Sequence, residues 1–482
     1  MKLAHKLTSA ALVLASASLV QAATRFDPKD TTAHGLKNFG FSLFQSLYKT
    51  EDKEPVAVSP MSLGEALILA TAGAEKETAG ELTSLFVPPS AIAQGANASM
   101  LVEGISRLRG DLVSYAKNSN GAFVFTSANS LVGNSNRSVQ FKYKPGFQKL
   151  AQEKFGASVV DYDFQDRATV GKINAWVDKN TQGKITELIN KLEADDVAVL
   201  LNAVYSRGKF LSHFGALTEG KYTNAEGKTL DATYMSQSSY LEFAENKDVK
   251  VLSLAIGDSS KPTSPEIALD ILVPTSTSDL DKLVASLSGK AYTDLVGKLK
   301  PEMVELKLPA SLVKQKEALR LGSTLTSAPF KLDRPFDQDN AQFGPMGSTV
   351  KEANLYINDV AHKVFYEVTP FGFEAAAATA VIMAGATSMP QYKPVSVEGP
   401  SVHVIRHIPT GTPLFISVVD SPVKYDEKRL VEFIEIGVKS DKRISAEVAD
   451  GVMRATYARS PAKVQIVVVD KNGKVVRTVK SL

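Results

Sequence analysis

The order of helical and strand patterns along the chain restricts its fold more than any other feature of the sequence. Apolar residues recur at helical spacing near the N-terminus, as at Leu36, Phe39, Leu43 and Leu47. Later segments have the pattern of strands, with candidates at residues 267–273, 303–308, 356–368 and 402–419. Because the two kinds of element are segregated, the sequence predicts an α+β fold and not a repeating βαβ array.

Three local patterns predict individual elements. Ser59 followed by Pro60 is typical of a helix start, with a capping hydroxyl before a proline. Residues 174–189 predict another helix, and the apolar run at 197–205, which only Asn202 interrupts, predicts a strand buried on both faces. Near the C-terminus, valine-rich runs on both sides of an Asn-Gly pair predict a β-hairpin.

Composition argues against most enzyme classes. The chain has 482 residues without a cysteine, so disulfides, thiolate catalysis and cysteine-ligated zinc are excluded. Neither a Gly-x-Ser-x-Gly elbow nor a His-Glu-x-x-His motif occurs. His403 and His407 lie four residues apart in a strand-like pattern, where that spacing does not converge on a metal. We therefore expect no catalytic residue, metal or cofactor, and no enzymatic activity.

Charge and the N-terminal segment bear on partners and location. The net charge is +3 without a block of like charges, so we expect no nucleic-acid partner. Arg107, Arg109 and Lys117 fit a solvated helix face better than a glycosaminoglycan site. Residues 1–22 combine a basic start, a short apolar run and a small-residue cleavage pattern, which predicts a signal peptide. We expect a protein without a membrane span, secreted to the extracellular space, or to the periplasm if the source is bacterial.

Several motifs, in the right order, resemble the serpin family of serine protease inhibitors. Residues 58–62 (Val-Ser-Pro-Met-Ser), 173–185 and 201–209 are similar to its second helix, its sixth helix and a strand of its main sheet. Residues 372–379 (Gly-Phe-Glu-Ala-Ala-Ala-Ala-Thr) resemble the hinge of its reactive loop, and residues 405–415 resemble its closing strands. The resemblance covers residues 33–422, and we expect a serpin domain at 23–422.

The resemblance implies a fold, a mechanism and a set of residues. The fold would have about three β-sheets, eight or nine helices and an exposed reactive-centre loop. A target protease would cleave the loop and remain trapped as a covalent acyl-enzyme while the cut loop inserts into the main sheet, with the inhibitor acting as a monomer. The hinge would comprise Gly372, Phe373, Glu374, Ala375, Ala376, Ala377, Ala378 and Thr379, and the shutter beneath the opening sheet Ser59, Ser62, Asn202 and His362.

Family spacing places the scissile bond at Ala386-Thr387. A small residue before the bond suits an elastase-like serine protease, or a cysteine protease. Residues 364–392 contain no Lys or Arg, which argues against a trypsin-like target. Met383 and Met389 leave a chymotrypsin-like target open.

Other residues depart from the family pattern. Pro370 and Phe371 replace acidic or small polar residues, and Phe373 replaces the usual Thr or Ser at the first position to insert. Phe210 stands where a tryptophan is usual, and Ser417 where a glycine is. A bulky ring slows entry into a packed sheet, so the alternative is a non-inhibitory serpin acting as a carrier, chaperone or storage protein.

The chain continues beyond the expected end of the domain. Residues 423–482 carry 13 Lys and Arg against 8 Asp and Glu, and include the predicted hairpin. We expect a C-terminal extension, which serves attachment, export or partner contact, or simply packs on the domain.

Overall fold

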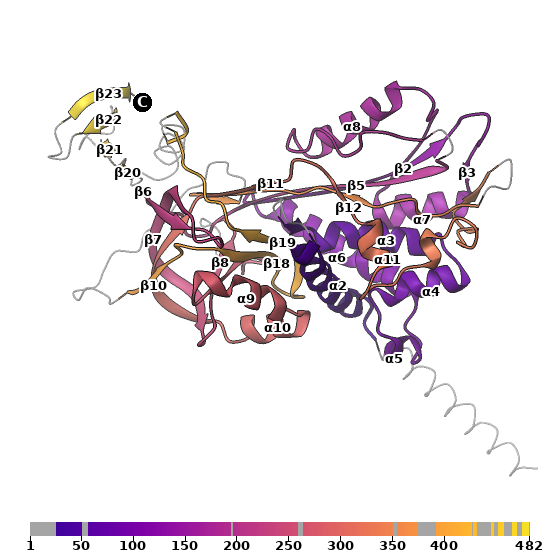
Figure 1. Cartoon of the computed structure of the whole chain (residues 1–482), viewed down its shortest axis with the longest axis horizontal. Coiled ribbons are helices and arrows are strands. Elements are labelled where there is room, and N and C mark those ends of the chain that lie inside the picture. The colour runs from indigo at the N-terminus through magenta and orange to yellow at the C-terminus, as the bar shows by residue number, and fades with distance from the viewer. Residues whose placement is uncertain are drawn as a thin grey trace, which may run out of the picture.

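Most of the helices lie in the first 180 residues, and most of the strands follow them in the chain (Figure 1). The computed structural model describes residues 26–50, 56–193, 196–258, 264–349, 354–373, 392–426, 428–430, 445–447, 452–456, 465–469 and 475–481. Its α-helices are α2 (Pro28–Thr50), α3 (Pro60–Ala72), α4 (Lys76–Ser84), α5 (Pro89–Ile92), α6 (Ala98–Asn118), α7 (Pro145–Phe155), α8 (Ala168–Asn180), α9 (Leu280–Ser286), α10 (Gly289–Val296) and α11 (Gly322–Thr326). Short 3-10 helices lie at Thr277–Asp279 and Arg334–Phe336.

A six-stranded sheet crosses the middle of the molecule (Figure 1). Helix α8 covers one of its faces, and α3 and α6 lie on the other (Figure 1). In spatial order its strands are β11 (Ser311–Lys314), β15 (Phe365–Thr369), β16 (Gly372–Phe373), β5 (Ala198–Lys209), β2 (Phe123–Asn134) and β4 (Ser158–Tyr162).

A ten-stranded sheet holds much of the remaining core. Its strands β18 and β19 are buried along their whole length, and this burial includes the polar side chains His403, Arg406 and His407 of β18. Its main path runs through β1 (Ala57–Val58), β19 (Thr412–Val419), β18 (Ser401–His407), β9 (Ile267–Pro274), β8 (Val249–Ile256), β7 (Thr229–Glu245), β10 (Lys300–Pro309) and β17 (Lys393–Ser396), with β6 (Ala216–Thr223) and β20 (Ser445–Glu447) joined through β7.

Short strand pairs complete the fold. Two of them are β12 (Leu319–Arg320) with β14 (Ala361–His362), and β3 (Lys142–Tyr143) with β13 (Gly347–Ser348). Close to the C-terminus, β21 (Val452–Thr456), β22 (Gln465–Val469) and β23 (Val475–Ser481) form an antiparallel sheet. The segregated helices and mixed sheets confirm the α+β class.

Helix α3 begins as the sequence predicts. Ser59 is its N-cap, and the Ser59 hydroxyl accepts a hydrogen bond from the backbone N–H of Ser62. Pro60 occupies the first helical position, where its missing N–H leaves no helical bond unmade. The helix is buried over most of its length and packs beneath the six-stranded sheet.

Two predicted elements are shorter than expected. The helix predicted at 174–189 ends at Asn180, because Gln182 and Gly183 adopt positive φ angles of 52° and 79°. The Asn174 side chain then accepts backbone hydrogen bonds from Leu188 and Ile189 and holds the non-helical segment in place. The strand predicted at 356–368 contains only β14 and β15, because residues 354–360 have no strand beside them.

Candidate functional site

A two-residue strand, β16, enters the six-stranded sheet between β15 and β5. Gly372 pairs with Thr369 on β15 and with Lys209 on β5, and Phe373 pairs with Val368 and Gly208. The Thr369 hydroxyl also donates to the Gly372 carbonyl oxygen at 3.0 Å. The chain has therefore already turned back into the sheet where the predicted hinge begins.

Gly372 is the residue that permits this turn. Its φ of 150° lies in a region that residues with a side chain rarely adopt. A Cβ atom there would lie 1.8 Å from the carbonyl oxygen of Gly208 on the neighbouring strand. Close contact between the two backbones thus requires a glycine at position 372.

Aromatic rings fill the space around β16. Phe373 and Phe210, both departures from the family pattern, are buried together with Phe371. The backbone N–H of Phe210 donates to the carbonyl oxygen of Phe371 at 2.9 Å. The Phe373 ring lies over Gly208, where a side chain would otherwise stand. The expected steric obstacle at Phe373 is thus accommodated by a glycine on the adjacent strand.

Below β16 a cavity of about 170 Å³ separates the two halves of the sheet. One wall is the lower part of β5, from Ala198 to Asn202, and the other is the segment from Leu355 to His362. Apolar side chains of α3, among them Leu63 and Leu67, line it as well. The cavity lies in line with β16. If β16 were longer, it would run between the two walls of the cavity, β5 and residues 355–362.

The four predicted shutter residues lie together beside this cavity. The Ser59 backbone N–H donates to His362 Nε2 at 3.0 Å, and the Ser59 hydroxyl donates to the Leu414 carbonyl oxygen at 2.8 Å. The Ser62 hydroxyl donates to Asn202 Oδ1. These bonds join α3, β14, β5 and β19 at one point.

Burial keeps His362 neutral. Its side chain is enclosed, and this burial lowers its pKa to about 4. An unprotonated Nε2 is what the bond from the Ser59 N–H requires. The hydrogen bond between Ser59 and His362 therefore depends on a neutral histidine.

A buried carboxylate that sequence reasoning missed, Glu65, extends this network. Asn202 Nδ2 donates to Asn129 Oδ1 at 2.8 Å, and Asn129 Nδ2 donates to Glu65 Oε2 at 3.0 Å. The Ser127 hydroxyl also donates to Glu65, and Arg109 Nε lies 3.9 Å from Glu65 Oε1. A polar path thus runs from α6 to the shutter. The available signal was that Glu65 is the one charged residue in the apolar run 60–72.

Burial and polar contacts shift the pKa of Glu65 in opposite directions. The carboxylate is fully buried, which raises its pKa. The bonds from Ser127 and Asn129 and the nearby Arg109 guanidinium oppose that rise without cancelling it. The carboxylate is therefore the group in this network most sensitive to loss of a partner.

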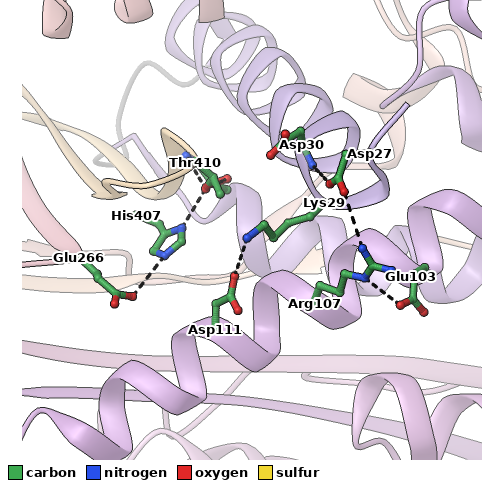
Figure 2. A network of polar contacts seen from close by, with 10 residues as sticks. Asp27, Lys29, Asp30, Glu103, Arg107, Asp111, Glu266, His407 and Thr410 are labelled. Carbon is green, nitrogen blue, oxygen red and sulfur yellow. Dashed lines mark hydrogen bonds and ion pairs between the residues drawn. The ribbon is translucent and has the colours of Figure 1, made fainter. Parts of the chain in front are cut away.

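Two of the basic residues predicted to form a solvated helix face, Arg107 and Arg109, lie beside carboxylates. Arg107 contacts Glu103 at 2.9 Å and Asp27 at 3.7 Å, while Lys29 reaches Asp111 at 3.1 Å (Figure 2). Arg109 faces Glu65. The contacts of Lys29 and Arg107 tie the start of α2 to α6 (Figure 2).

The two histidines of β18 each have a local partner. His403 Nδ1 lies 2.9 Å from the Tyr366 hydroxyl, and His407 Nδ1 lies 2.8 Å from the Thr410 hydroxyl. Within the described ranges, no three His, Asp or Glu side chains assemble as metal ligands. In the same part of the chain, every helix is too short or too polar to cross a bilayer.

Other predicted residues lie outside the described part of the chain. They are the signal peptide 1–22, the hinge residues after Phe373, and the predicted scissile bond Ala386-Thr387. Their assignments stay predictions from sequence.

Comparisons with known proteins agree on one family. The family model described as Serpin (serine protease inhibitor) matches residues 34–422. Human Serpin B8 is 29% identical over 80% of this chain and 97% of its own length. The human leukocyte elastase inhibitor is 25% identical over 80% of this chain and 97% of its own length. The structure of human thyroxine-binding globulin superposes with a TM-score of 0.69 at 18% identity, covering 83% of this chain and 100% of that one.

Proposed function

Because the chain belongs to the serpin family, we propose that it inhibits proteases through its loop at 374–391. A target protease cleaves the loop at Ala386-Thr387 and forms an acyl-enzyme. The freed N-terminal part of the loop then inserts between β5 and β15 and carries the protease with it. The human leukocyte elastase inhibitor is among the relatives, which supports an elastase-like serine protease as the target.

The observation that carries this proposal is the position of β16 above the cavity. Phe373 faces Gly208 and Val368, so six further steps in the same ladder bring Thr379 opposite both Asn202 and His362. Thirteen steps bring Ala386 opposite Leu355, which lines the cavity. An extended β16 would thus include the loop residues up to the proposed scissile bond.

The side chains suit this extension. Phe373 is buried, and because strand residues alternate between faces, the residues that follow it into the core are Ala375, Ala377 and Thr379. Small side chains enter without displacing α3, and Thr379 would join the polar shutter. Each inserted residue gains ladder hydrogen bonds worth about 1 kcal/mol net, so a dozen residues gain on the order of 10 kcal/mol.

The decisive experiment is incubation with an elastase-like protease. We expect a covalent complex that survives SDS. We also expect a released C-terminal fragment whose mass shows that its first residue is Thr387. Trypsin is the matched control, because the loop contains no Lys or Arg. Complete cleavage of the loop without any covalent adduct contradicts the inhibitor proposal.

The alternative is a non-inhibitory carrier, chaperone or storage serpin. Its support is the replacement of the usual polar residues by Pro370 and Phe371, together with the shared fold of thyroxine-binding globulin. Cleavage without adduct and without a gain in thermal stability is the outcome that selects this alternative.

We also propose that the protein is exported and acts as a monomer. The composition of residues 1–22 supports export. Mass spectrometry of the mature protein should give an N-terminus at Ala23, and light scattering should give the mass of one chain. An intact N-terminus contradicts export by this signal.

A further inference from the structure

The segment that continues beyond the serpin match packs against β7 and the connection between β10 and β11, and its Arg429 reaches β15, the strand that leads to the predicted hinge. The Val423 backbone donates to the Ala310 carbonyl oxygen at 2.8 Å and accepts from the Thr233 N–H at 2.9 Å. The Tyr425 N–H donates to the Thr233 hydroxyl at 2.9 Å. Tyr425 and Leu430 are both buried. Residues 423–426 and 428–430 thus belong to the surface of the domain, although the family match ends at Pro422.

Arg429 of this segment lies beside a carboxylate of β15. Arg429 Nη2 lies 3.2 Å from Glu367 Oε1, and the Glu367 side chain is only 12% exposed. Asp426 orients the turn, because its carboxylate accepts from the Arg429 N–H at 2.8 Å and its carbonyl oxygen accepts from the Leu430 N–H at 3.0 Å. A carboxylate this enclosed is costly unless a cation lies beside it.

Glu367 stands where the first inserting charge would arrive. One step beyond Phe373, the ladder brings Glu374 between Glu367 on β15 and Arg207 on β5. All three side chains would project from the same face of the sheet, because Phe373, Val368 and Gly208 share the opposite one. Arg207 Nε is buried and has no hydrogen-bond partner among the described residues.

We propose that Arg429 is a positioning residue for loop insertion. It neutralises Glu367 so that Glu374 can enter beside that carboxylate and bind Arg207. Without Arg429, two carboxylates would lie directly opposite each other on neighbouring strands, which is destabilising. The C-terminal extension therefore contributes to the trap itself. This inference rests on the proposed inhibitory function.

The test compares Arg429→Gln with Lys428→Gln, its exposed neighbour, which serves as the matched control. Arg429→Gln should raise the moles of inhibitor consumed per mole of trapped protease severalfold, while the rate of first cleavage stays unchanged. Arg429→Lys should restore most trapping, because the cation is retained. The double variant Arg429→Gln/Glu367→Gln should also restore trapping, whereas a merely structural loss would persist in both.

A second readout separates this inference from the proposed function. The melting temperature of each variant is measured before and after loop cleavage. If the wild type gains no stability when cut, insertion does not occur and both proposals fail. If the wild type gains stability, and Arg429→Gln traps protease as efficiently as Lys428→Gln, only the role of Arg429 is overturned.

Discussion

The Phe373 ring occupies the place of a side chain at Gly208: a Cβ atom on Gly208 would lie 2.5 Å from Phe373 Cε1. The large residue at the start of the hinge and the glycine on the facing strand therefore belong together. Phe373 is 2% exposed, so the residue that we propose to insert first is already anchored in the core.

Gly208→Ala should expel β16 from the sheet. The added methyl group overlaps the Phe373 ring, and overpacking of this kind costs about 1–3 kcal/mol. The melting temperature should fall, and proteases should cleave the hinge faster. Gly215→Ala is the control, because a Cβ there meets nothing within 4 Å. Equal melting temperatures for the two variants would contradict the packing described.

The register of insertion predicts opposite effects for adjacent residues. Ala377→Glu should abolish the covalent complex, because in the proposed inserted register position 377 would turn into the core beside α3. Ala378→Glu should retain much of it, because position 378 would face outward in that register. Gel quantification of the SDS-stable complex measures both. If both variants trap protease equally, the loop does not insert in this register.

Protonation of His362 should weaken the folded state in acid. Its pKa falls from an ordinary 6.5 to about 4 on folding, so the unfolded chain binds the proton more readily. Neutral His362 therefore contributes to the free energy of unfolding in full above pH 6.5, and this contribution is lost as the pH falls towards 4. The total loss is on the order of 3 kcal/mol. Urea denaturation at pH 7.5 and 5 should show a smaller pH effect in His362→Gln. An unchanged pH effect contradicts this assignment, since His403 and His407 shift in the same direction in both proteins.

Arg109→Met should destabilise the protein more at pH 8 than at pH 5. The Glu65 pKa is already raised on folding and rises further without the guanidinium, so the cost of the ionised carboxylate grows with pH. We expect a loss of about 2 kcal/mol at pH 8, measured by urea denaturation. Arg107→Met, whose side chain is 49% exposed, should change stability by under about 1 kcal/mol at both pH values. A loss at Arg109 that does not depend on pH speaks against a role through Glu65.

Local sequence signals predicted the elements whose causes are local. Ser59 and Pro60 predict the start of α3, since a cap and a proline act within one turn. The grouping of Ser59 with Asn202 and His362 came from family resemblance. Spacing alone could not have given it, because these residues meet only when α3, β5 and β14 are assembled.

The missed features depend on long-range packing. Glu65 meets Asn129 and Arg109 only in the folded core, and Arg429 meets Glu367 across 62 positions of sequence. The helix predicted at 174–189 was wrong beyond Asn180, because Gln182 and Gly183 adopt positive φ angles that periodicity does not reveal. The strand predicted at 356–368 was wrong at its start, because a strand needs a neighbour and residues 354–360 border a cavity.

The reversal at Pro370 and Phe371 has a kinetic consequence. Starting a hairpin is entropically costly, because the turn must form before the first hydrogen bond between the strands can stabilise it. Here the turn and its first two rungs already exist, so the proposed insertion would lengthen a strand that has already started. Trapping would then depend on whether β16 extends between β5 and β15 before the acyl bond is hydrolysed, and the turn would not have to form within that time.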